Sequence, residues 1–274
     1  MLRTRVLTAL VLVSVFGAIL FGAPGPAWTV FAAVIAALSA WEWTGLIRVT
    51  GPGRIVFASL LGVLVLVIAP SGQVVETNWP SLILFAASAV FWLIVAPLWL
   101  KAGWQVPRRW QGLALGVLLL LPPALAMIAI RQQFGPWWLL AIMASVWMAD
   151  VAAYFVGRRF GRVKLAPRIS PGKSREGAYG AIVGVLLYAM IVAFASGALA
   201  PEPLAVSVLA LACVVHTVVS IVGDLFESLA KRQAGVKDSG AILPGHGGVL
   251  DRIDSLLSTL PLVALAAHLP SLVA

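Results

Sequence analysis

The stretch QGLALGVLLLLPPALAMIAI, residues 111–130, contains no charged side chain over its whole length. An α-helix needs about 20 consecutive apolar residues to cross the hydrocarbon core of a bilayer. Further apolar windows of similar character lie before and after it. Together, the nine windows fall at about residues 6–22, 28–47, 55–70, 80–100, 111–130, 136–156, 178–200, 204–226 and 253–272. The sequence therefore predicts an all-α, polytopic integral membrane protein with about nine transmembrane helices.

The composition of the whole chain agrees with this class of protein. Of its 274 residues, 61% are hydrophobic and 11% are charged, whereas soluble domains carry roughly 25% charged residues. No polar block is long enough to fold as a soluble domain, so we expect residues 1–274 to form a single transmembrane domain. Its C-terminal part, residues 140–274, carries the motifs that suggest chemistry.

The distribution of lysine and arginine predicts the orientation in the membrane, because cytoplasmic loops carry an excess of these bases. With a cytoplasmic N-terminus and nine crossings, 18 of the 19 bases fall inside and only Arg131 falls outside. We therefore expect a cytoplasmic N-terminus, an external C-terminus and a location in the bacterial cytoplasmic membrane. The net charge of +9 is spread over short loops, which indicates contacts with membrane lipids and not with nucleic acid.

Carboxylates are concentrated near the end of this apolar chain. The stretch KDSGAILPGHGGVLDRIDS, residues 237–255, holds three of the ten acidic residues. Asp224 and Glu227 lie three residues apart near the end of one predicted helix, and Asp251 and Asp254 lie three apart at the start of the next. Residues three apart share a helix face, so four carboxylates would meet at one membrane surface.

Four carboxylates that meet without counterions would repel one another, and two interpretations remove that repulsion. Divalent metal is one, because Mg²⁺ prefers hard oxygen ligands and binds substrate phosphates as well. The alternative is a set of salt bridges with the nearby bases Lys231, Arg232, Lys237 and Arg252.

Two polar stretches are suited to bind phosphate. In LPGHGG, residues 243–248, Gly247 and Gly248 let a phosphate approach backbone amides. His246 in this loop is either a donor to phosphate or an ordinary loop histidine. The second stretch, ISPGKSREG at residues 169–177, combines hydroxyls with bases, which phosphate oxygens bind well. Its candidate ligand-binding residues are Ser170, Lys173, Ser174 and Arg175.

Two further carboxylates, Glu42 and Asp150, fall inside predicted membrane helices. Acidic residues at such depth are costly and usually face a partner or a water-filled cavity. We expect both to line a polar cavity that opens to the cytoplasm.

The C-terminal motifs also resemble a known family. Between Ser228 and Asp254 the chain reads SLAKR, four residues, KD, then LPGHGG and DRID. This pattern is similar to the signature of the phosphatidate cytidylyltransferases, or CDP-diacylglycerol synthases. The segments DVAAYFVGR, residues 150–158, and ISPGKSREG also resemble that family, as does the Glu42-Trp43 pair. Gly172 departs from the family pattern, which has a second lysine there.

The resemblance implies a function. Members of the family transfer a cytidylyl group from CTP to phosphatidic acid, which gives CDP-diacylglycerol and pyrophosphate in phospholipid biosynthesis. They are Mg²⁺-dependent, multi-span and dimeric. We therefore expect CTP and phosphatidic acid as substrates, Mg²⁺ with or without a second monovalent or divalent cation, and a homodimer.

The resemblance also implies a set of site residues. The expected metal ligands are Asp224, Asp251 and Asp254. The expected catalytic residues are Asp224, Asp251, Lys237, Asp238 and Arg252. The expected substrate ligands are Lys231, Arg232, His246, Gly247 and Gly248, together with Ser170, Lys173, Ser174 and Arg175.

Two other functions are compatible with parts of the sequence. Another CTP-dependent membrane lipid phosphotransferase or kinase would use similar carboxylates and nucleotide loops, but it would give a different product. A transporter would also have many spans and an intramembrane acid such as Asp150. The clustering of polar residues at one membrane face, with no inverted repeat, argues against the transporter.

Overall fold

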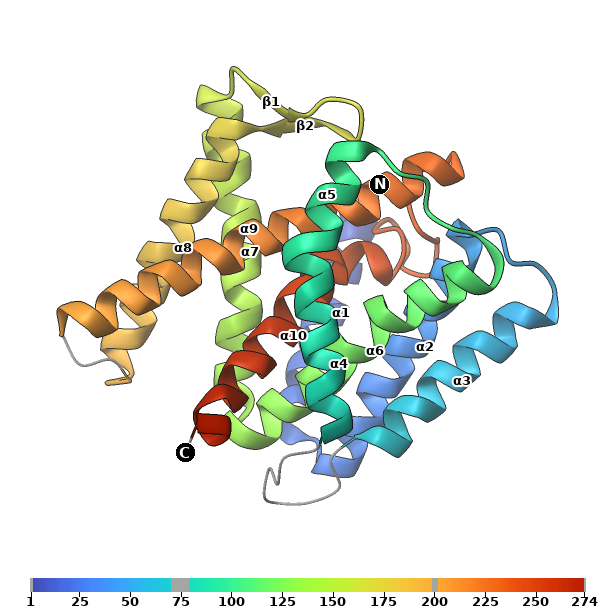
Figure 1. Ribbon diagram of the computed structural model, residues 1–274, viewed down its shortest axis with the longest axis horizontal. Helices are drawn as coiled ribbons and strands as arrows, with labels where there is room; N and C mark the ends of the chain where they lie inside the picture. The colour runs from blue at the N-terminus through green and yellow to red at the C-terminus, as the bar shows by residue number, and fades with distance from the viewer. Residues whose placement is uncertain (1, 70–78, 199–201, 274) are drawn as a thin grey trace.

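The computed structural model describes residues 2–69, 79–198 and 202–273 (Figure 1). The elements in chain order are α1 (Leu2–Gly22), α2 (Gly25–Leu46), α3 (Pro52–Ile68), α4 (Trp79–Val90), the π-helical turn η1 (Phe91–Val95), α5 (Ala96–Ala102), α6 (Arg109–Phe134), α7 (Pro136–Phe160), β1 (Lys164–Ala166), β2 (Ser170–Ser174), α8 (Arg175–Ala195), α9 (Pro203–Ala234) and α10 (Leu250–Val273).

Each predicted apolar window contains a helix. Within the described ranges, six helical segments are long and apolar enough to cross a membrane: α2, α4 to α5 as one continuous segment, α6, α7, α8 and α9. The apolar parts of α1 and α3, Val6–Gly22 and Pro52–Ile68, are shorter. The chain is therefore a polytopic membrane protein, and the count of nine crossings stays a prediction.

Helix α6 forms the centre of the main body and packs against α2, α3, α4, α7 and α10. Most of its middle is buried, and this stretch contains Pro122 and Pro123. Trp43 of α2 lies against α6 and donates its indole N–H to the carbonyl of Gly112 over 2.8 Å. A Cβ atom on Gly116 would lie 2.6 Å from the Trp43 ring. The glycines of α6 thus permit the close approach of α2.

Helices α7 and α8 form an arm beside this body, together with the first half of α9 (Figure 1). The arm has its own small core of Ala149, Ala181, Val185 and Cys213. Large apolar side chains of α8 such as Val183, Leu187 and Ile191 are exposed, which suits a helix that faces lipid.

The segment between α7 and α8 is a β-hairpin and not an irregular loop, which is a small departure from the expected all-α class. Strands β1 and β2 are antiparallel, with Lys164 opposite Ser174 and Ala166 opposite Ser170. The hairpin pairs backbone groups of a polar segment that has no apolar face to bury in a helix bundle. It therefore holds part of the ISPGKSREG motif in an extended conformation.

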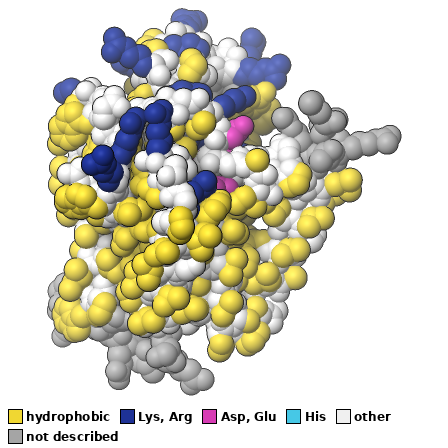
Figure 2. Space-filling view, turned by 90° about the vertical axis from the view of Figure 1, so that its right-hand side faces the viewer, with side chains coloured by type: hydrophobic (Ala, Val, Ile, Leu, Met, Phe, Trp, Pro, Cys, Tyr) yellow, Lys and Arg dark blue, Asp and Glu magenta, His cyan; other side chains and the backbone are white. Residues whose placement is uncertain are grey.

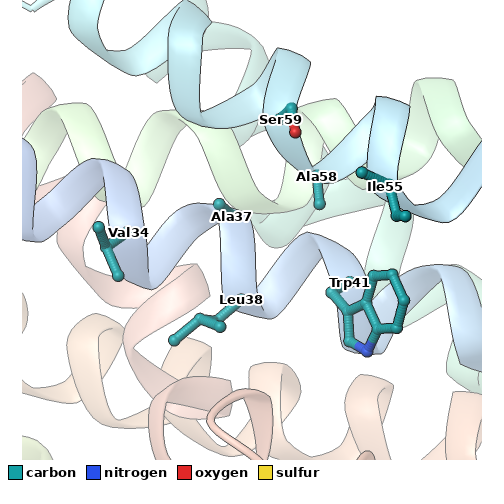
Figure 3. A pocket seen from close by; sticks show the side chains of 7 residues that line it. All are labelled: Val34, Ala37, Leu38, Trp41, Ile55, Ala58 and Ser59. Atoms are coloured by element: carbon teal, nitrogen blue, oxygen red, sulfur yellow. The ribbon is translucent and has the colours of Figure 1, made fainter.

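Helices α2 and α3 leave a shallow apolar groove of about 260 Å³ between them (Figure 3). Ala37 and Ala58 lie between the two helices, and Trp41 closes one end. Arg54 stacks 4.1 Å above the Trp41 ring and donates to the Trp41 carbonyl, which fastens the start of α3 to the end of α2. No charged side chain lines the groove, so the polar site lies elsewhere.

The packing of Trp43 against Gly116 predicts the effect of adding one methyl group. Gly116→Ala should destabilise the protein by about 1–3 kcal/mol, because a methyl group there overlaps a fully packed indole. Thermal unfolding in detergent measures this. The matched control is Gly17→Ala in α1, where a Cβ meets nothing within 4 Å. Equal unfolding temperatures for the two variants would contradict the described contact.

Candidate functional site

The predicted motifs meet where α9 ends and α10 begins. These two helices pack against each other, and Ser258 of α10 donates to the Val219 carbonyl of α9 over 2.9 Å. A Cβ atom on Gly223 would lie 2.4 Å from the Ser258 hydroxyl oxygen, so the helices approach closely there. The loop of residues 235–249 connects them, and strand β2 and the end of α2 complete the surroundings.

Asp251, in the first turn of α10, has four donor groups within hydrogen-bonding distance, one of which, the Ser239 hydroxyl, shares its single proton between Asp251 and Glu42. Its Oδ1 accepts from Lys231 Nζ at 2.6 Å. Its Oδ2 accepts from the Ser239 amide at 2.9 Å, the Ser239 hydroxyl at 3.0 Å and the Gly248 amide at 2.8 Å. Burial raises the pKa of the Asp251 carboxyl, but these hydrogen bonds outweigh burial and hold the pKa below its usual value. Asp251 is therefore a buried anion that fixes the connecting loop.

Lys231 of α9 lies between two buried carboxylates. It forms ion pairs with Glu227, one helical turn earlier, and with Asp251. The side chains of Glu227 and Asp251 are 3% and 5% exposed. The salt-bridge interpretation is therefore confirmed for Lys231. Its positive charge is paired with carboxylates inside the protein.

Asp224 occupies a more open position. It forms an ion pair with Lys173 of β2, and its side chain is 22% exposed. Ser228 donates to Asp224 Oδ1 over 3.3 Å. Asp150 of α7 and Asp254 of α10 interact electrostatically with both Asp224 and Lys173. Three carboxylates and one lysine from four elements therefore share this part of the site.

Other predicted residues lie on the connecting loop, the hairpin and the first turns of α8 and α10. Lys237, Asp238, Arg252 and Arg175 are exposed, and Ser170 is half-buried. Arg232, also exposed, donates to the Ile169 carbonyl over 3.4 Å and so touches the hairpin.

Two predicted phosphate ligands have other contacts. Ser174 is buried at the start of α8, where its hydroxyl accepts from the Gly177 amide over 3.2 Å as a helix N-cap. The Gly248 amide, which was expected to bind a phosphate, donates a hydrogen bond to Asp251. Gly247 has a positive φ of 81° and closes a bridge to Leu243. His246 is half-buried, and its Nδ1 has no hydrogen-bond partner within the described residues.

The prediction that Glu42 lines a polar cavity was wrong, because its carboxylate is buried against the connecting loop. Glu42 is 2% exposed, and it accepts the amides of Val249 and Leu250 at 3.0 and 2.8 Å. An acid inside an apolar window was the available signal, but its partners are about 200 positions away along the chain. The contribution of Ser239 was also missed, because a lone serine in a loop carries no signal.

The donor chemistry of the site suits Mg²⁺, which binds hard oxygen atoms. Among the described residues, no group of three or more histidine, cysteine, aspartate or glutamate side chains is close enough to hold a metal ion by itself. Mg²⁺ usually takes one or two protein carboxylates and completes its shell with water and substrate phosphates. The half-exposed Asp224, with Asp254 and Asp150 near it, fits that requirement best.

Comparison with known proteins identifies relatives along almost the whole chain. The sequence model of the "Cytidylyltransferase family" matches residues 3–269. A phosphatidate cytidylyltransferase of Pseudomonas aeruginosa is 39% identical over 269 residues, which cover 96% of each chain. One of Haemophilus influenzae is 35% identical, covering 95% of this chain and 96% of that one. One of Thermotoga maritima is 36% identical over 68% of each chain.

The burial of Lys231 predicts that the two lysines of the site contribute unequally to the stability of the protein. Lys231→Met leaves Glu227 and Asp251 buried without their cation, so it should cost about 3–5 kcal/mol of stability. Lys173→Met removes a partly exposed pair and should cost at most about 1 kcal/mol. Unfolding in detergent compares the two variants. Adding Glu227→Gln to Lys231→Met should recover part of the lost stability. If none is recovered, Lys231 does not serve as the counterion of Glu227.

Proposed function

Because this chain belongs to the cytidylyltransferase family, we propose that the site between α9, α10 and β2 carries out its reaction. The protein is a phosphatidate cytidylyltransferase: it transfers a cytidylyl group from CTP to phosphatidic acid and releases pyrophosphate. The product, CDP-diacylglycerol, is a precursor in phospholipid biosynthesis. The observation that carries this conclusion is the 39% identity to a relative of that name over 96% of the chain.

The reaction joins two polyanions, and the site supplies the charge needed to bring them together. The phosphate monoester of phosphatidic acid attacks the α-phosphorus of CTP, and pyrophosphate leaves. The attacking oxygen is already anionic, so no strong general base is required. Lys173 lies beside Asp224 and is 27% exposed, so its ammonium can contact a phosphate that enters the site. Lys237 and Arg252, which are exposed, are proposed to bind the departing pyrophosphate.

We propose that Mg²⁺, with or without a second cation, binds one or two of the three aspartates Asp224, Asp251 and Asp254, and that substrate phosphates and water supply its other ligands. When bound, the ion would supply positive charge that stabilises the negative charge developing on the reacting phosphates. The exposure of Asp224 supports its role most directly. A metal bond to Asp251 would require Lys231 to release Oδ1, because the four donor groups around that carboxylate occupy both oxygens.

The remaining proposed ligands surround this centre. Ser170 lies on β2, Arg175 begins α8, Arg232 lies near the end of α9 and His246 lies in the glycine loop, and Arg232 joins α9 to the hairpin through the Ile169 carbonyl. Asp238 lies next to Gly247, where a Cβ would approach the Asp238 Cβ to 3.4 Å. It is proposed to orient the glycine loop.

We also propose that the site faces the cytoplasm of a bacterium from within a single transmembrane domain. Lysine and arginine side chains gather at one end of the molecule, above a hydrophobic belt (Figure 2), which supports this orientation. The start of α1 lies toward that end in Figure 1, and the end of α10 lies toward the other. Arg131, the exception, donates to the Leu20 and Ala23 carbonyls at the opposite end. A homodimer is proposed on the resemblance alone.

The metal proposal predicts that catalysis depends on the negative charge of Asp224. Asp224→Asn keeps the shape of the side chain but loses its anion, so CDP-diacylglycerol formation should fall about 10²-fold or more. Purified protein is incubated with CTP, Mg²⁺ and phosphatidic acid, and pyrophosphate and lipid product are measured together. Glu202→Gln, at the exposed start of α9, is the matched control. Near-normal turnover by the Asp224 variant would remove the metal assignment from this residue.

The orientation predicts which positions a membrane-impermeant maleimide reaches. The native Cys213 is buried, so it gives little background. Arg168→Cys, in the hairpin turn, should be labelled in inverted membrane vesicles but not in intact spheroplasts. Ser196→Cys, at the end of α8, should show the opposite pattern. Labelling of both positions from one side would disprove the proposed topology.

A further inference from the structure

We infer that Glu42 of α2 is a positioning residue for the catalytic loop: its carboxylate holds residues 239–250 in place and, through Ser239, sets the position of Asp251. This inference rests on the proposed function, because it assigns a role within the same site. Glu42 comes from the second helix of the chain, far from the C-terminal motifs in sequence.

The Glu42 carboxylate makes three contacts with the loop. Its Oε1 accepts the Val249 amide at 3.0 Å, and its Oε2 accepts the Leu250 amide at 2.8 Å. The Ser239 hydroxyl lies 3.0 Å from Oε2. With 2% of the residue exposed, no water competes for these donors. A buried carboxylate survives only when such donors satisfy it.

The contacts supply a cap that the local sequence lacks. The first amides of a helix have no partner within the helix, and a serine, threonine, aspartate or asparagine before the first turn normally accepts from one of them. The residue before α10 is Val249, whose side chain cannot accept a hydrogen bond. Glu42 replaces the missing cap from another helix, and its negative charge interacts favourably with the positive end of the α10 dipole.

Ser239 connects Glu42 to Asp251. Its hydroxyl oxygen lies 3.0 Å from Glu42 Oε2 and 3.0 Å from Asp251 Oδ2, and its amide donates to the same Asp251 oxygen at 2.9 Å. The Gly248 amide, next to the Val249 amide bound by Glu42, also donates to Asp251 at 2.8 Å. A shift of the loop away from Glu42 would therefore move two donors that hold Asp251.

Two glycines of the loop leave the space that the Glu42 carboxylate occupies. A Cβ on Gly240 would lie 2.5 Å from Glu42 Oε1, and a Cβ on Gly248 would lie 2.4 Å from Oε2. The loop backbone thus closes over the Glu42 side chain from both sides. Gly248 serves this contact, whereas the sequence pattern suggested an approach of phosphate.

The test is Glu42→Gln in the full-length protein. The amide keeps the size of the side chain, but its NH₂ group faces donors and leaves one loop amide without an acceptor. We expect kcat for CDP-diacylglycerol formation to fall about tenfold or more, as for other groups that orient ligands of a metal. The Mg²⁺ concentration for half-activation should rise, while KM for CTP changes less than kcat.

Hydrogen exchange provides a readout that does not depend on activity. Amides of residues 239–251 should exchange faster in the Glu42 variant, and amides of α7 and α8 should not. The control is Ser39→Ala, a buried residue one turn earlier on α2 whose hydroxyl bonds only to the Ile35 carbonyl. It should leave kcat, Mg²⁺ dependence and exchange unchanged.

Ser239→Ala keeps the test decisive if Glu42→Gln does not fold. It removes the hydroxyl that joins the two carboxylates and should change Mg²⁺ dependence in the same direction by a smaller factor. Wild-type Mg²⁺ dependence and loop exchange in the variants would overturn the inference. If the wild-type protein made no CDP-diacylglycerol, the proposed function would fail, while loop exchange would still decide whether Glu42 holds the loop.

Discussion

The structure of the site depends on providing polar partners for three acidic side chains that are buried in a protein that is otherwise apolar. Glu42 and Glu227 are 2% and 3% exposed, and the side chain of Asp251 is 5% exposed. Unpaired charges in such surroundings are very costly, so each must have a cation or several hydrogen-bond donors. Lys231 provides the cation for Glu227 and Asp251, and backbone amides of the connecting loop serve Glu42 and Asp251. The loop is held by this requirement, because it has little apolar surface to bury.

This requirement brings together distant parts of the chain. Lys231 and Glu227 lie on α9, Asp251 on α10 and Glu42 on α2, and the hairpin between α7 and α8 adds Lys173 at Asp224. The apolar helices position these elements through close contacts such as that of Trp43 with Gly112. The division between buried and open carboxylates has a chemical consequence. Asp251 and Glu42 hold backbone amides, whereas Asp224 keeps 22% of its side chain exposed and is the carboxylate that we propose for metal.

Much of the fold followed from hydrophobic run length, since every apolar window contains a helix. The hairpin was missed because its few residues show no alternation that distinguishes a strand from a polar loop. In the site, the motifs around Asp224, Lys231 and Asp251 were identified from charge and spacing. The ion-pair partner of each residue was not predictable. Lys173, for example, pairs with Asp224 although it lies 51 residues earlier in the chain. The salt-bridge interpretation is confirmed for Lys231, and the metal interpretation stays a prediction.

The sequence alone determined the class of protein and the segments in which its acidic and basic motifs lie. Long uncharged runs fix membrane helices, because the bilayer offers backbone groups no water. The rarity of acids in such a chain marked the residues that matter. Tertiary structure alone decided which carboxylate has which role: Glu42 caps α10, Asp251 fixes the loop and Asp224 stays open. Burial and hydrogen-bond partners set these roles, and both arise from contacts between segments that the order of residues does not specify.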